Sequence, residues 1–204
     1  MKFTDRTDVL RKSLDVCNIS YLHAPFFSPA LKSVGNVRRQ LGVRTFFNML
    51  GPLVNPVMPR YQLLGVYNLK LLRLYNYICQ ENGINCTIVH SLDGYDEISL
   101  TSPFKVSNGS GDRIYTPEEL GFRTCRPEEL SGGESIATAA RVFDRVLNGD
   151  AAPGQMDCVI ANAAFAIKSL CPRLDFEDAR MQASDSLYGG KAKEAFSKFL
   201  KINN

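Results

Sequence analysis

The stretch that decides the fold begins with Tyr61-Gln62-Leu63-Leu64-Gly65-Val66-Tyr67 and ends with Cys86-Thr87-Ile88-Val89-His90. Both runs are apolar with little alternation, which is typical of strands that are covered on both faces. Between them, Asn68 can cap a helix that stops at Asn82-Gly83. A strand, a helix and a strand within about thirty residues predict a βαβ unit, and therefore a parallel sheet with a right-handed crossover.

Helical patterns flank this unit on both sides in the sequence. The apolar spacing predicts helices over residues 5–17, 29–41, 134–147, 157–170 and 175–189, and a last helix that carries Ala195, Phe196, Phe199 and Leu200. In the first helix Val9, Leu10, Leu14 and Cys17 share one face, and residues 105–115 form a hairpin. We therefore expect an α/β fold in which helices flank a mostly parallel sheet.

The bulk composition narrows the class of protein. The chain has 204 residues, of which 45% are apolar and 22% charged, as in ordinary globular domains. The net charge of +3 is spread along the chain, so nothing favours a nucleic-acid partner. No apolar run has transmembrane length and the first residues do not form a signal peptide, so we expect no membrane association. The six cysteines lack CxxC spacing, which favours reduced thiols in a cytoplasmic protein.

A second distinctive stretch runs from Gly42 to Pro56. Arg44 follows a glycine turn, and Gly51-Pro52 and Asn55-Pro56 end the short helix that we expect after it. A guanidinium on a helix shoulder can hold a planar carboxylate through two parallel hydrogen bonds. An internal ion pair in an amphipathic helix is the alternative interpretation.

The densest group of acids lies directly after the second predicted strand. Asp93, Asp96 and Glu97 belong to the turn Ser-Leu-Asp-Gly-Tyr-Asp-Glu-Ile-Ser, at a carboxyl end where ligands gather in open α/β sheets. Adjacent carboxylates suit Mg²⁺ with waters and phosphates completing its shell, although a solvated turn has the same composition. The two histidines, His23 and His90, have no evident partner, and no nucleophile motif or phosphate loop is present, so we assign neither a catalytic nor a cofactor-binding residue.

Three motifs resemble one known family. Arg-Thr-Phe-Phe-Asn-Met-Leu-Gly-Pro-Leu-Val-Asn-Pro (44–56), Asp-Gly-Tyr-Asp-Glu (93–97) and Ala-Pro-Phe-Phe-Ser-Pro-Ala-Leu-Lys (24–32) resemble segments of the anthranilate phosphoribosyltransferases. The resemblance implies that Arg44 contacts the anthranilate carboxylate and that Asp96 and Glu97 hold Mg²⁺. It also places Ala24 and Pro25 in the segment that lines the route of anthranilate. Phe27 and Ser28 stand where the family usually has two histidines, so hydrogen bonding by those histidines does not carry over.

The resemblance also implies a reaction and a set of partners. A phosphoribosyl group would move from phosphoribosyl diphosphate to the amine of anthranilate, with release of diphosphate, in tryptophan biosynthesis. The fold implied is that of the phosphoribosyltransferases and nucleoside phosphorylases. We expect a homodimer or another form of self-association, because the helices of residues 29–55 would otherwise expose apolar faces.

Two family motifs are missing from this sequence. A glycine-rich GTGGD turn and a KHGN segment, both N-terminal to the matched region in family members, have no counterpart here. We therefore expect residues 1–28 to begin a truncated α/β domain, residues 29–56 to belong to an incomplete small helical domain, and residues 57–204 to form the main α/β domain. The chain alone is then expected to be inactive.

Two other functions remain open at this point. A pyrimidine nucleoside phosphorylase-like enzyme, or a transferase for another aromatic acceptor, would have the same fold. A non-catalytic protein that binds a ligand or a partner belongs to a different class, which the missing phosphate motifs favour. The combined presence of Arg44, Asp96 and Glu97 favours the transferase.

Overall fold

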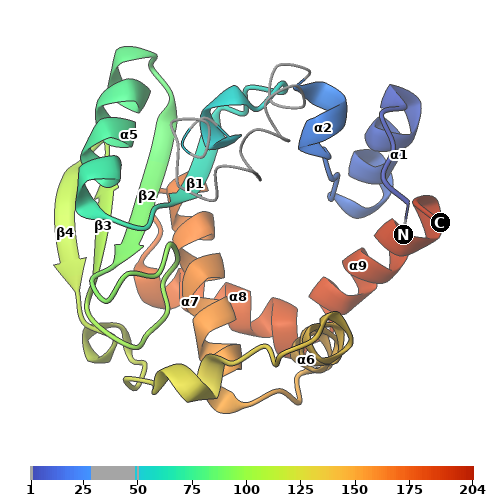
Figure 1. The fold of residues 1–204 in the computed structure, drawn as a ribbon. Helices are drawn as coiled ribbons and strands as arrows, with labels where there is room; N and C mark the ends of the chain where they lie inside the picture. Colours follow the sequence, from blue (N-terminus) through green and yellow to red (C-terminus); the bar gives the residue numbers. More distant parts are fainter. Residues whose placement is uncertain (1, 29–48, 50) are drawn as a thin grey trace. The chain divides into compact units, whose positions relative to one another are not determined.

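The computed structural model describes residues 2–28, 49 and 51–204 (Figure 1). The chain divides into two compact units. One unit contains Met1–Pro59 together with Ala192–Asn204, and the other contains Arg60–Lys191. The predicted division at residues 28 and 56 stays a prediction.

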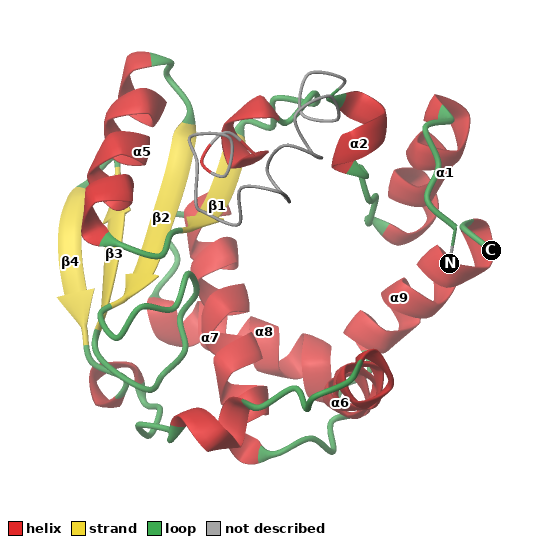
Figure 2. Ribbon diagram, viewed as in Figure 1, coloured by secondary structure: helices red, strands yellow, loops and turns green. Residues whose placement is uncertain are grey.

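The second unit is built on a four-stranded sheet (Figure 2). Its strands are β1 (Tyr61–Gly65), β2 (Asn85–Ser91), β3 (Phe104–Asn108) and β4 (Gly111–Tyr115), in the order β1-β2-β3-β4. β1 and β2 are parallel, and β2–β3 and β3–β4 are antiparallel. The α/β fold, the βαβ unit and the hairpin are confirmed. The sheet is mixed, because among the described strands the only parallel pair is the one that the helical crossover joins.

Helices cover both faces of this sheet. Every residue of β2 after Asn85 is buried, and successive side chains of a strand point to opposite faces. α5 (Leu69–Glu81) packs on β2 and β3, and α7 (Pro153–Leu170) packs on β1 and β2. This arrangement explains why the strands read as continuous apolar runs in the sequence.

Aromatic rings fill the core between the hairpin and the last helices of this unit. The rings of Phe104 and Phe165 meet edge to face with centroids 5.7 Å apart, and Phe165 lies 5.0 Å from Phe176. Phe176 opens α8 (Phe176–Tyr188), which packs along α7. The unit also contains α6 (Ile136–Asn148) and the short 3-10 helices η2 (Glu118–Leu120) and η3 (Pro127–Leu130).

The predicted helix caps are present in α5 and α8 but not in α7. The Asn68 side chain accepts from the backbone N of Leu71 at 2.8 Å, and the Asp175 side chain caps α8, both as expected. The prediction that Asp157 caps α7 is wrong, because that helix begins at Pro153. Proline is well suited to the first helical position, since it has no N–H to leave unpaired there.

The first unit contains α1 (Thr7–Cys17), α2 (Ala24–Phe27), η1 (Gly51–Val54) and α9 (Lys191–Ile202), whose first residue lies in the other unit. The expected apolar face of α1 is wrong in one respect: Leu14 is 49% exposed, whereas the polar Ser13 is buried. Asn203 donates from its side chain to the Ser13 hydroxyl at 3.1 Å, which satisfies this buried group. The predicted helix over residues 29–41 lies outside the described residues.

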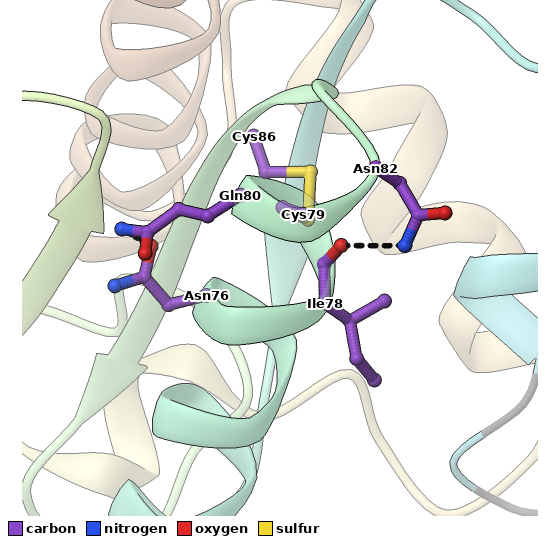
Figure 3. Close-up of a disulfide and its surroundings, with 6 residues drawn as sticks. All are labelled: Asn76, Ile78, Cys79, Gln80, Asn82 and Cys86. Carbon is purple, nitrogen blue, oxygen red and sulfur yellow. Dashed lines mark hydrogen bonds between the residues drawn. A yellow bond between two sulfur atoms is a disulfide. The ribbon is translucent and has the colours of Figure 1, made fainter.

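The cysteine prediction is wrong at two positions. Cys79, near the end of α5, and Cys86, in β2, form a disulfide (Figure 3). The turn between them returns the chain so that their Cα atoms lie 6.2 Å apart, within the range that a disulfide requires. The remaining cysteines, Cys17, Cys125, Cys158 and Cys171, are free thiols. No helix of the described residues is long and apolar enough to cross a membrane.

Candidate functional site

The candidate site is the acidic loop, residues 92–98, which leaves the carboxyl end of β2. Gly94 adopts a φ of +108°, a backbone conformation that favours glycine, and so turns the chain within the loop. Asp96 and Glu97 are both exposed. No hydrogen bond or ion pair joins either carboxylate to another residue in the part of the chain that the structure describes. Both carboxylates are therefore accessible to a ligand from solution.

Asp93 has a different role from the other two acids. Its carboxylate accepts a hydrogen bond from the Thr101 hydroxyl, and its backbone N donates to the Ser102 hydroxyl at 3.3 Å. These contacts tie the start of the acidic loop to the segment that leads into β3. In the part of the chain that the structure describes, the other two acids predicted at this strand end have no such contact and are available to a cation.

The acidic loop lies directly against the end of β1. A Cβ atom at Gly65 would come within 1.6 Å of the carbonyl O of Asp96, so only glycine fits at this position. The backbone N of Ser91 donates to the carbonyl O of Tyr95 at 3.1 Å, and the loop is held against β2 as well. The sheet therefore sets the position of the Asp96 backbone from two strands.

Among the described residues, no cationic side chain forms an ion pair with Asp96 or Glu97. The pKa of Glu97 is raised above its ordinary value, mainly because neighbouring atoms remove water from the carboxyl group and also because the Asp96 carboxylate lies close. The residue is exposed nonetheless, so this loss of water is partial. A bound cation would offset both effects, since it favours the ionised form of a carboxyl group.

The donor set fits Mg²⁺ in one particular manner. No group of three or more His, Cys, Asp or Glu side chains that could hold a metal occurs among the described residues. Mg²⁺ does not need such a cage: it keeps several waters and is commonly held by one or two carboxylates together with substrate phosphates. Two adjacent, exposed carboxylates with no protein partner in the described chain match that mode of binding.

The predicted acceptor site belongs to the other compact unit. Ala24 and Pro25 are both exposed and form the first turn of α2, which follows His23. The His23 ring stacks on Phe3 with centroids 4.3 Å apart and planes 4° from parallel. Arg44 lies outside the described residues. The roles predicted for Arg44, Ala24 and Pro25 stay predictions.

His90 is a packed residue of β2. It is 5% exposed, and its Nδ1 lies 2.8 Å from the carbonyl O of Val66. Sequence analysis missed this partner, and it also missed Gly65 and Ser91. A glycine inside an apolar strand is a signal of close backbone approach, so Gly65 could have been found from the sequence. Ser91 gave no such signal.

The sequence comparisons match this chain over almost its whole length. The profile described as "Glycosyl transferase family, a/b domain" matches residues 1–193. The anthranilate phosphoribosyltransferase of Bacteroides fragilis YCH46 is 58% identical over 203 residues, and that of Bacteroides thetaiotaomicron is 52% identical over 204 residues. Each alignment covers 100% of this chain and 61% of the relative. The chain thus spans about three fifths of the length of these curated relatives.

Solved structures have the same fold. The anthranilate phosphoribosyltransferase of Thermus thermophilus superposes with a TM-score of 0.86 at 28% identity, over 96% of this chain and 59% of that one. The enzyme of Saccharomyces cerevisiae in complex with PRPP and Mg has a TM-score of 0.86 at 24% identity, over 97% of this chain and 56% of that one. At 24% identity, the similarity to the yeast enzyme shows only that the two chains share a fold.

Proposed function

Since the chain belongs to the glycosyl transferase family through the α/β domain that its residues 1–193 match, we propose that it carries the acceptor- and metal-binding part of an anthranilate phosphoribosyltransferase. The reaction transfers a phosphoribosyl group from phosphoribosyl diphosphate to the amine of anthranilate, a step of tryptophan biosynthesis. The observation that carries this proposal is the exposed Asp96–Glu97 pair, which lies at the carboxyl end of β2 and in the motif that resembles the family's metal loop.

The chain's own residues have distinct roles in this proposal. Arg44 holds the anthranilate carboxylate and so directs the amine, while Ala24 and Pro25 form the wall of the acceptor route. Asp96 and Glu97 hold Mg²⁺, which when bound neutralises the charge that develops on the departing diphosphate. No residue is assigned as a general base, and most of the rate enhancement then comes from positioning and electrostatics.

The location and assembly are also proposals. We propose a cytoplasmic location and a Mg²⁺ requirement, and the solved structure of the yeast enzyme in complex with PRPP and Mg supports the requirement. Self-association, in a homodimer or another arrangement, stays part of the proposal.

Anthranilate is fluorescent, which allows a direct test of the acceptor. We expect saturable binding of anthranilate to the wild-type chain and strong weakening in Arg44→Ala. Arg44→Lys should also weaken binding, because lysine cannot form two parallel hydrogen bonds to a carboxylate. Glu134→Gln, at an exposed position outside the acidic loop, serves as the control and should bind anthranilate as the wild type does.

Competition between ligands tests which acceptor the chain binds. Anthranilate should compete with its own fluorinated analogues, whereas thymine or uracil should not compete. Displacement of anthranilate by a pyrimidine, or equal binding by wild type and Arg44→Ala, would contradict the proposed acceptor.

A further inference from the structure

Two side chains from different elements hold the backbone that follows Glu97. Ser91 is the last residue of β2, and its hydroxyl donates to the carbonyl O of Glu97 at 2.6 Å and accepts from the backbone N of Ser99 at 3.1 Å. Asn162 lies in α7 and contacts the residue between them. Its Oδ1 accepts from the backbone N of Ile98 at 3.1 Å, and its Nδ2 donates to the carbonyl O of Ile98 at 2.8 Å.

These four hydrogen bonds fix two successive peptide units. In the peptide between Glu97 and Ile98, the carbonyl binds Ser91 and the N–H binds Asn162. In the next peptide the assignment is reversed: the carbonyl binds Asn162 and the N–H binds Ser91. Neither unit can rotate without breaking bonds to both β2 and α7. Because the first unit is attached to the Cα of Glu97, the direction in which that side chain leaves the backbone is set.

The orientation of the Asn162 amide is itself dictated by its partners. Nδ2 faces two carbonyl oxygens, that of Ile98 and that of Cys158 at 2.9 Å, whereas Oδ1 faces an N–H group. A reversed amide would lose all three hydrogen bonds. The Cys158 thiol also donates to the carbonyl O of Ile98 at 3.0 Å. Burial raises the pKa of this thiol to about 12, so it keeps its proton at neutral pH.

A sharp boundary in burial separates the held backbone from the acid pair. Ser91, Ile98 and Ser99 are 0% exposed, whereas Asp96 and Glu97 are exposed. The hydrogen-bonded frame lies on the buried side, and the carboxylates project from it into solvent. Such a frame limits the conformations that the pair can adopt, and less entropy is then lost when a cation orders the two carboxylates.

We propose that Asn162, acting with Ser91, is a positioning residue for the divalent cation at Asp96 and Glu97. This inference rests on the proposed metal site. Asn162 does not touch the cation; it orients the backbone that carries one ligand. Loss of such an outer partner typically weakens metal binding at least about tenfold.

The test uses Mn²⁺ as the probe, because it prefers oxygen ligands and its binding is measured by electron paramagnetic resonance. With the full 204-residue chain, Asn162→Ala should weaken Mn²⁺ binding by about tenfold. Ser169→Ala is the matched control, since this α7 hydroxyl bonds to the carbonyl O of Ala166 in its own helix. It should bind Mn²⁺ as the wild type does.

A double-mutant cycle with Glu97→Gln separates positioning from general damage to the fold. Because Asn162 acts through Glu97, the double variant Asn162→Ala/Glu97→Gln should bind Mn²⁺ no more weakly than Glu97→Gln alone. Additive losses would overturn the inference. A loss of Mn²⁺ affinity in Glu97→Gln without any loss of affinity in Asn162→Ala would also overturn it.

Failure of the proposed metal site has a different signature. If Glu97→Gln binds Mn²⁺ as tightly as the wild type, the site itself is refuted, and with it the role of Asn162. If Asn162→Ala does not fold, Ser91→Ala decides, because it removes a single hydroxyl from the same frame. Ser91→Ala should weaken Mn²⁺ binding and show the same non-additivity with Glu97→Gln, and wild-type affinity in this variant would overturn the inference.

Discussion

Gly65 is the residue at which the sheet and the acidic loop come closest. The missing Cβ leaves room for the carbonyl O of Asp96, which would otherwise lie 1.6 Å from it. Because the obstructing atom belongs to the backbone, no side-chain rotation could relieve the clash. The requirement for glycine here is steric, and it links the strand sequence to the placement of a proposed metal ligand.

Gly65→Ala should therefore lower the free energy of unfolding and displace the backbone of the acidic loop. Forcing an extra methyl group into a packed site typically costs about 1–3 kcal/mol, and we expect a loss in that range in urea unfolding. Gly109→Ala is the control, since no atom lies within 4 Å of its added Cβ. Equal unfolding midpoints for Gly65→Ala and wild type would show that the loop shifts without cost.

The site residues differ in how far the sequence could predict them. The acid pair was predictable because adjacent carboxylates after a buried strand are a local pattern with a chemical meaning. Asn162 was not, because it lies 64 positions from Ile98 and looks like any polar residue in an alanine-rich helix. Only tertiary packing brings its amide to the loop. Ser13 is similar: its burial depends on Asn203, 190 positions away.

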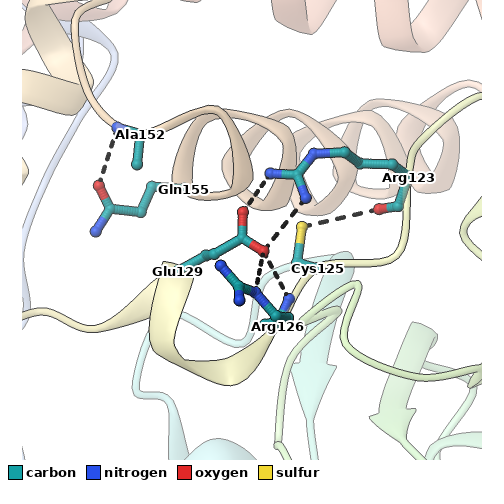
Figure 4. Close-up of polar contacts among 6 residues, drawn as sticks. All are labelled: Arg123, Cys125, Arg126, Glu129, Ala152 and Gln155. Carbon is teal, nitrogen blue, oxygen red and sulfur yellow. Dashed lines mark hydrogen bonds and ion pairs between the residues drawn. The ribbon is translucent and has the colours of Figure 1, made fainter.

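At the scale of elements, one carboxylate in η3 holds the segment that leads into this helix. Glu129 accepts from the Arg123 guanidinium, with Nη2 2.5 Å from Oε2, and from the backbone N of Arg126 at 2.9 Å (Figure 4). Gln155 in the first turn of α7 accepts from the backbone N of Ala152 at 3.3 Å. Hydrogen bonds from Arg123 and from the Arg126 backbone lower the pKa of Glu129 to about 2.

This pKa predicts the acid sensitivity of the segment that leads into η3. A carboxyl group whose pKa is lowered by folding stabilises the native state above its ordinary pKa of about 4.3, and this contribution is lost as pH falls toward about 2. Glu129→Gln should thus lower stability at neutral pH and flatten the decline between these values. Thermal unfolding over a pH series measures how the stability of each variant changes with pH, with Glu128→Gln as the control. Parallel pH profiles for wild type and Glu129→Gln would contradict the assignment.

The βαβ unit shows how element-level prediction succeeds and where it stops. Its strands and its Asn68 cap follow from local composition, and the structure confirms them. The disulfide between Cys79 and Cys86 was missed, because their spacing matches no common motif and the pairing depends on how the turn folds back. The start of α7 was misplaced because Asp157 competes with Pro153 as a helix-start signal.

The disulfide gives a prediction of its own. Closing a loop of this length should contribute about 2 kcal/mol to the free energy of unfolding, and Cys79→Ser/Cys86→Ser should lose that amount under oxidising conditions. Titration of the unfolded, unreduced chain should find the four free thiols at positions 17, 125, 158 and 171. Six reactive thiols would contradict the bond. Disulfides are rare in a reducing cytoplasm, so the count also bears on the proposed location.

At the scale of the whole molecule, the mixed α/β fold and its likeness to the glycosyl transferase family were both predictable. The helix-flanked sheet follows from strand and helix periodicity, and the resemblance follows from rare residue orders such as that of residues 44–56. The antiparallel share of the sheet was underestimated, because the sequence predicts the hairpin of residues 105–115 but does not show that β3 pairs with β2. The proposed acceptor and metal residues occur in different compact units, and each was identified from its own motif.

The most direct measurement is a Mg²⁺ titration of the isotope-labelled chain, followed by backbone amide chemical shifts. We predict that the shifts centre on residues 93–99, and that they vanish in Asp96→Asn/Glu97→Gln. They should weaken as pH falls, because the raised pKa of Glu97 lets protons compete with the cation at a higher pH than for an ordinary carboxyl group. Shifts that persist in the double variant, or that centre elsewhere, would contradict a metal site at the acidic loop.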